Sequence, residues 1–271
     1  MEMPSQGINV CDGRKAGLDL AGIPRQPASA AEAAAALEML TARLRRCRDP
    51  RAAFSEIYGV ITRRVAETVA ARSDIFLEPA WISRLAGRFC ERYLQTLAGS
   101  VEARHDCDAW AVSYRYTGLR ATVPIQEAML GLSAHINYDL ALGIFQNIVE
   151  LGGRDHARQL ARYRHDHDAV NDLLRASVSE ALERLSRDHG CVLSAFLGRS
   201  ALPLARWLMM QVLARWRARV WSDVLALLAS PGDGERAARI QRMDRRASRW
   251  GRLLSVPSAI YLGLWAGAPR A

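Results

Sequence analysis

The chain has 271 residues, half of them hydrophobic, and a formal net charge of +9 at neutral pH. This length and composition are enough to bury a large core, and no break in composition after about residue 30 indicates a second domain. The positive charge comes almost entirely from arginine, with Lys15 as the single lysine. Such a bias is typical of a GC-rich bacterial genome. Solvated faces covered by arginine therefore explain the charge more readily than a nucleic-acid partner does.

The cysteines and the apolar stretches indicate in which cellular compartment the protein resides and whether it spans a membrane. The five cysteines contain no CxxC pair and are odd in number, which speaks against a disulfide framework or a thiolate zinc site. The N-terminus lacks the basic, apolar and small-residue order of a secretion signal. No apolar stretch is both long enough and free enough of charge to span a bilayer. We therefore expect a cytoplasmic protein without a membrane span.

In chain order, residues 1–28 are rich in Gly and Pro and are expected to form a flexible leader. Ser29 and Glu32 then match the S-x-x-E capping box that opens a helix. From there apolar residues recur every three or four positions, so residues 29–271 are expected to form one all-α domain, a bundle of about eight helices. The predicted helices cover residues 29–47, 51–72, 79–98, 108–117, 123–151, 155–187, 199–229 and 233–252, with a short piece near 257–265.

The segment 123–151 is predicted to be the buried central helix, because apolar side chains occupy nearly every direction around it. One stripe on it is small and polar: Ala128, Gly131, His135, Asp139, and Gly143 or Gln146. The small residues would leave room beside His135 for another backbone, a ligand or an ion. Because residues four apart share a helix face, His135 and Asp139 can ligate one metal ion together or form an acid/base dyad in which the carboxylate holds a His135 tautomer.

A second polar set lies within residues 162–171. The apolar residues of that helix place His167 near the middle of the buried face, with Asp166 and Asn171 at its edges. The opposite, solvated face receives His165, Asp168 and Asp172.

Buried ionisable groups are costly unless they are paired, ligate a metal or do chemistry. We therefore predict one functional site from five residues: His135, Asp139, Asp166, His167 and Asn171. Of these, His135, Asp139 and Asp166 are the candidate ligands of a divalent metal ion. The alternative is a buried hydrogen-bond network that joins two core helices without chemistry.

The order of these residues resembles an all-helical, mostly bacterial family catalogued as domain of unknown function 5995. The shared motifs are Pro124-Ile125-Gln126, Ala134-His135-Ile136-Asn137 with Asp139-Leu140, and Asp166 leading to Val170-Asn171; weaker matches are Phe76-Leu77 to Arg84-Leu85, Trp110, and Arg217 with Trp221. The resemblance spans most of residues 52–230. The position after the aspartate is often aromatic in that family, and here it is His167. The resemblance supports the fold and the site and implies no particular reaction.

Three functions fit these patterns. The first is an enzyme that acts on a small, largely apolar molecule by metal-assisted or general acid/base chemistry, for which natural-product metabolism is one setting. The second is a non-catalytic helical module. The third is a binder of nucleic acid or anionic membrane through the arginine-rich helix 233–252, although a solvated helix pairing with Glu235 and Asp244 explains that composition as well. Motifs of serine hydrolases, zincins and nucleotide-binding loops are absent from the sequence.

Overall fold

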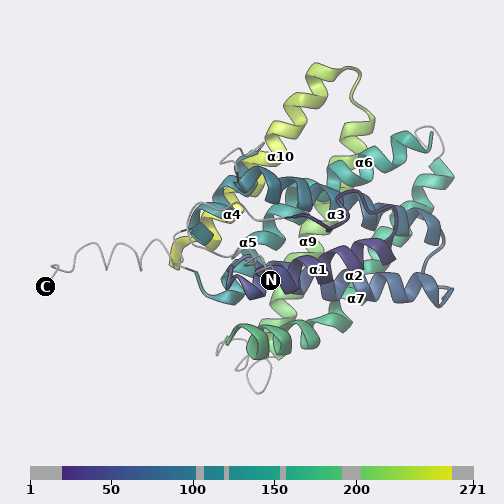
Figure 1. The fold of residues 1–271 in the computed structure, drawn as a ribbon. Coiled ribbons are helices and arrows are strands. Elements are labelled where there is room, and N and C mark those ends of the chain that lie inside the picture. The colour runs from purple at the N-terminus through teal and green to yellow at the C-terminus, as the bar shows by residue number, and fades with distance from the viewer. Residues whose placement is uncertain (1–19, 102–106, 119–121, 153–156, 191–202, 258–271) are drawn as a thin grey trace, which may run out of the picture.

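The computed structural model describes residues 20–101, 107–118, 122–152, 157–190 and 203–257. Within these residues the protein is all-helical and contains no strand, as predicted. The elements are α1 (Ala30–Arg46), α2 (Ala52–Ala70), α3 (Pro79–Val101), α4 (Asp108–Gly118), α5 (Pro124–Ala134), η1 (His135–Asp139), α6 (Leu140–Glu150), α7 (Ala157–His189), α9 (Pro203–Leu228) and α10 (Asp233–Leu254) (Figure 1). The short helix predicted near 257–265 falls almost entirely outside the described residues.

Several helices begin at the signals found in the sequence. The Ser29 hydroxyl accepts a hydrogen bond from the Glu32 amide at 3.2 Å, and the Glu32 carboxylate accepts one from the Ala28 amide at 3.0 Å. Proline occupies the first position of α3 and of α5, where its missing N–H costs no helical hydrogen bond. Local sequence chemistry therefore fixes where these three helices start.

Part of the expected leader packs against the domain. Leu20 and Ile23 are buried in the core. The Arg43 guanidinium on α1 donates to the carbonyl of Ala21 at 2.9 Å. The structure thus differs from the expectation of a flexible segment over residues 20–28, because two apolar side chains there find an apolar surface to cover.

The continuous segment of α5, η1 and α6 is the central element. Helix α2 packs against α1, α5 and α7, while α3 and α9 contact α6, and α10 crosses α4 and α5 (Figure 1). Most side chains of the central segment are consequently buried. The buried central helix predicted for residues 123–151 is therefore present.

The central segment is not a regular α-helix, however. Residues His135–Asp139 form a π turn, in which the Leu140 amide donates to the carbonyl of His135, five residues earlier. Apolar spacing predicted an uninterrupted α-helix here and gave no sign of the wider turn. Single π turns inside α-helices occur often at functional sites, and this one carries both residues of the predicted dyad.

The cysteines and helix lengths bear on the expected compartment. No helix among the described ranges is long and apolar enough to cross a membrane. Cys90 and Cys107 are free and buried. Cys47, in contrast, is disulfide-bonded, so the argument against disulfides from the odd cysteine count does not hold at this residue.

Candidate functional site

The predicted dyad is formed and fully enclosed. His135 and Asp139 are each 1% exposed. The Nδ1 atom of His135 lies 3.0 Å from Oδ2 of Asp139. Because a carboxylate only accepts hydrogen bonds, this contact places the imidazole proton on Nδ1 and leaves Nε2 as a proton acceptor.

Two further residues hold Asp139. The Trp110 indole donates its N–H to Oδ2 at 2.9 Å. The Arg92 guanidinium lies 3.6 Å from Oδ1, close enough for an ion pair although too far for a hydrogen bond. The carboxylate is thus fixed from three sides by α3, α4 and the His135 ring.

The free nitrogen of His135 is the unsatisfied atom of the dyad. Nε2 is buried and has no hydrogen-bond partner among the described residues. Burial lowers the pKa of His135 below its usual value, and the hydrogen bond to Asp139 opposes that shift only in part. The imidazole is therefore neutral at physiological pH, with an unused acceptor in a dry environment.

Aromatic rings fix the orientation of His135. Phe89 stacks on the imidazole with ring centroids 3.4 Å apart and planes 6° apart. Tyr58 and Phe54 meet the imidazole edge-on, at 4.6 and 5.6 Å. A Cβ atom on Gly131 would lie 2.3 Å from Cγ of Phe54. The room predicted beside the small residues is therefore filled at Gly131 by an aromatic ring.

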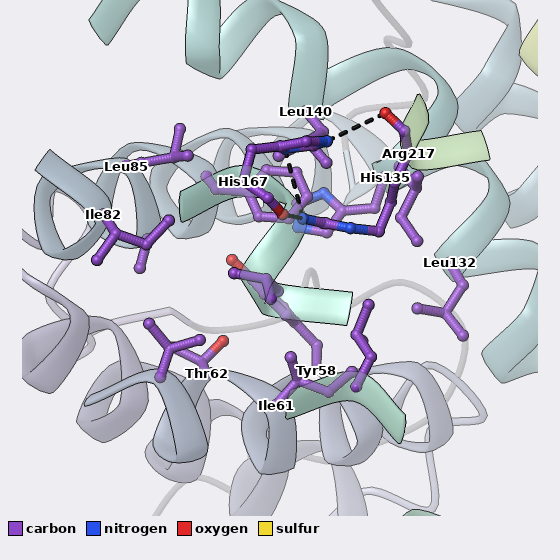
Figure 2. Close-up of a pocket in the computed structure, with 16 residues that line it drawn as sticks. Tyr58, Ile61, Thr62, Ile82, Leu85, Leu132, His135, Leu140, His167 and Arg217 are labelled. Carbon is purple, nitrogen blue, oxygen red and sulfur yellow. Dashed lines mark hydrogen bonds between the residues drawn. The ribbon is translucent and has the colours of Figure 1, made fainter. Parts of the chain in front are cut away.

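His135 lines a cavity of about 80 Å³ whose walls come mainly from α2, α3, α7 and the central segment. Figure 2 shows Tyr58 rising from α2 toward the side of the cavity that holds the histidines. The polar side chains on its wall are Tyr58, Thr62, His135, His167 and Arg217. All other lining residues are apolar, so a molecule bound here would be largely removed from water.

The Tyr58 hydroxyl is a second unsatisfied group at this cavity. It is buried and makes no hydrogen bond of normal geometry with the described residues, although the Thr62 side chain lies close enough to influence it. Burial raises the pKa of Tyr58 well above its usual value. The hydroxyl therefore stays protonated and can donate a hydrogen bond.

The second predicted cluster joins α7 to α9. His167 is 1% exposed, and its Nε2 donates to the backbone carbonyl of Arg217 at 3.0 Å. The Arg217 guanidinium donates in return to the carbonyl of His167, and its Nε donates to Oδ1 of Asn171 at 2.7 Å. Burial, together with the nearby positive charge of Arg217, lowers the pKa of His167 well below its usual value. His167 is thus a neutral ring that helps to hold Arg217.

Asp166 lies apart from the dyad. Its two carboxylate oxygens accept hydrogen bonds from the amides of Leu77 and Glu78, both at 2.7 Å, and it is not part of the cavity wall. In the described structure it fastens the segment that leads into α3. The role of Asp166 as a metal ligand beside His135 remains a prediction. No group of three or more His, Cys, Asp or Glu side chains in the described ranges is arranged to hold a metal ion.

The structure therefore brings His135 and His167 to one cavity, places Asp139 behind His135, and links Asn171 to the cavity through Arg217. Sequence reasoning missed Arg92 as a partner of Asp139. Trp110 and Arg217 are among the weaker matches to the family motifs. That match is the sequence signal that points to their role.

Comparison with known proteins places this chain in a family. The model of a family of unknown function, DUF5995, matches residues 30–257. Neither the curated proteins nor the solved structures contain a match.

Proposed function

The chain belongs to the DUF5995 family of unknown function, and from the geometry of its site we propose that it is an enzyme acting on a small, largely apolar molecule. His135 acts as a general base through Nε2. The observation that carries the proposal is this nitrogen, which is buried and unpartnered on a histidine of the cavity wall while Asp139 binds the opposite side of the ring.

The neighbouring residues have matching roles. A neutral imidazole can take a proton from a bound molecule, and the Asp139 carboxylate stabilises the imidazolium that results. Trp110 and Arg92 keep the carboxylate in place. The Tyr58 hydroxyl, which remains protonated, can donate to an oxygen that gains negative charge during the reaction.

A divalent metal ion is the alternative source of catalytic power, as predicted from His135 and Asp139. Besides Nε2 of His135, the Oδ1 atom of Asp139 also lacks a hydrogen-bond partner among the described residues. Both atoms are of types that bind divalent ions, but they cannot hold the same ion in this arrangement, because Nδ1 of His135 faces Asp139 and Nε2 points away from it. Dialysis against a chelator distinguishes the two routes, because activity should survive for acid/base catalysis and should be lost and restored by added metal for a metal enzyme.

The test of the enzyme proposal compares three purified proteins: the wild type, His135→Gln, and His165→Gln as a control. The side chain of His165 is 50% exposed and lies on the same helix as His167. Each protein is incubated with a small-molecule extract of the source organism and the mixture is followed by mass spectrometry. We expect wild type and His165→Gln to convert the same compound, and His135→Gln to leave it unchanged. Equal conversion by all three proteins would exclude His135 as the base.

The arginine-rich helix supports a structural surface more than a nucleic-acid interface. Arg236 pairs with Asp233 and Arg239 with Glu235, both at 2.6 Å, and Arg246 contacts Asp223. The expected pairing of Glu235 is therefore present. Asp244 instead accepts from the amides of Asp108 and Ala109 at 2.9 and 2.8 Å, so it holds the start of α4.

We retain the cytoplasm as the proposed location, with natural-product metabolism as one setting for such an enzyme. The free, buried Cys90 and Cys107 support a reducing compartment, whereas the disulfide at Cys47 speaks against it. Thiol labelling of Cys47 in intact cells would decide, since a cytoplasmic protein should carry a reduced thiol there.

A further inference from the structure

Arg217 is a buried cation with no carboxylate at ion-pair distance among the described residues. It is 5% exposed. In the described part of the chain its guanidinium donates to neutral acceptors, namely the side-chain oxygen of Asn171 and the carbonyl and ring of His167. Burial lowers the pKa of Arg217 to about 10, with only the more distant charge of Asp168 acting against the shift. A buried charge is costly unless it is paired.

Other arginines of the protein differ in this respect. The Arg184 guanidinium lies within hydrogen-bond distance of the carboxylates of Glu56 and Glu180. The more exposed Arg92 still lies beside the carboxylate of Asp139. For Arg217, the described residues supply no carboxylate at ion-pair distance, and its Nη1 atom makes no hydrogen bond with them. A bound anion would therefore supply a counter-charge that the described residues do not.

The surroundings of Arg217 indicate where that charge would come from. Arg217 lines the same cavity as His135, and it is the one charged side chain on the described wall of that cavity, since both histidines are neutral. A single guanidinium matches a singly charged, planar carboxylate in two parallel hydrogen bonds. A phosphate dianion would keep an uncompensated charge in this apolar space.

The rest of the cavity suits an apolar body. Ile61, Leu132 and Leu174 line the cavity and also line a neighbouring one of about 40 Å³. The neighbouring cavity continues to Met129 and Met209, and its wall is almost wholly apolar. The two cavities therefore adjoin, and the apolar side chains between them give the polar end of the first cavity an apolar surround.

We propose that the ligand of this cavity is a monocarboxylate with an apolar body, and that Arg217 binds its carboxylate. This inference rests on the proposed function, because it names the class of substrate for the proposed enzyme. Binding of the carboxylate can nevertheless be measured without any turnover. In this assignment Arg217 binds the charged end of the substrate, and His135 acts as the general base.

The test measures binding to the full-length protein by isothermal titration calorimetry. The ligands are octanoate and benzoate, each paired with its neutral alcohol, octanol and benzyl alcohol. We expect the wild type to bind at least one carboxylate about tenfold or more tightly than its alcohol. Arg217→Gln should weaken that carboxylate about tenfold to a hundredfold and leave the alcohol within about threefold.

Two further variants serve as a control for Arg217→Gln and as a test of the charge itself. Arg219→Gln is the matched control, because Arg219 lies on the same helix with a side chain that is 63% exposed; it should bind like the wild type. Arg217→Lys keeps the charge and should retain part of the carboxylate preference, which covers the case in which Arg217→Gln does not fold. Equal affinity for acid and alcohol, no binding of either carboxylate, or the same loss in Arg219→Gln would overturn the proposal.

Failure of this inference can be separated from failure of the proposed function. His135→Gln should bind the carboxylate within about threefold of wild type and yet fail to convert the compound found in extracts. If the wild type prefers the carboxylate through Arg217 but converts nothing, the enzyme proposal fails alone. If conversion depends on His135 but Arg217→Gln converts the compound at the wild-type rate, the assignment of Arg217 fails alone.

Discussion

Replacement of Asp139 by alanine should destabilise the protein strongly. The carboxylate accepts from Trp110 at 2.9 Å and from His135 at 3.0 Å, and it is 1% exposed. Without it, two buried N–H groups lose their acceptor, at about 1–3 kcal/mol each, and Arg92 loses its counter-charge. We therefore expect the free energy of unfolding to fall by about 3–5 kcal/mol.

The loss should be visible in both chemical and thermal unfolding. In urea, followed by far-ultraviolet circular dichroism, the midpoint should fall with an unchanged slope. The melting temperature should fall by about 6–20 °C, at roughly 2–4 °C for each kcal/mol in a chain of this size. Asp139→Asn should lose less than Asp139→Ala, because an amide oxygen still accepts from the two donors.

The control is Asp172→Ala, since the side chain of Asp172 is 77% exposed and forms an ion pair with an exposed arginine of α7. An exposed ion pair contributes at most about 1 kcal/mol. A loss for Asp139→Ala no larger than that for Asp172→Ala would refute the placement of Trp110 and His135 around a buried carboxylate.

Two further predictions concern pH and Asp166. Burial lowers the pKa of both His135 and His167, so the unfolded chain binds more protons and stability should fall as pH drops below about 6.5, by up to about 1.4 kcal/mol per pH unit for each histidine. His167→Gln should reduce this slope in urea unfolding between pH 7 and 5, and an unchanged slope would contradict the burial of a neutral ring. Asp166→Ala should cost about 2–4 kcal/mol and speed hydrogen exchange of the Leu77 and Glu78 amides, whereas unaltered exchange there would show that the carboxylate does not hold this segment.

Most of the helical architecture was predictable because its signals are local. Ser29, Pro79 and Pro124 each act within one turn of the helix that they begin. The apolar phase of α7 also separated buried His167 from exposed His165. Periodicity depends only on neighbouring residues, so a single sequence contains that information.

The contacts that define the site were less accessible. The amide of Leu77 lies 89 residues from Asp166 in sequence, and no local pattern connects them. Arg217 lies in α9, where arginines and apolar residues occur all around the helix, so its burial could not be read from spacing. These features follow from how distant helices pack, which the sequence does not express as a period.

The π turn at His135–Asp139 has a consequence for how this helix tolerates change. A π turn holds one residue more than the α-helical turn it replaces, so it offsets the angular positions of α6 from those of α5. Winding the same residues as a regular α-helix would rotate everything beyond the turn by about 100°. Asn147, which is fully buried and donates to the backbone of Trp81 at 3.2 Å, would then leave its acceptor. The register of α6 against α3 therefore depends on the π turn, which takes up one residue without turning α6 away from α3.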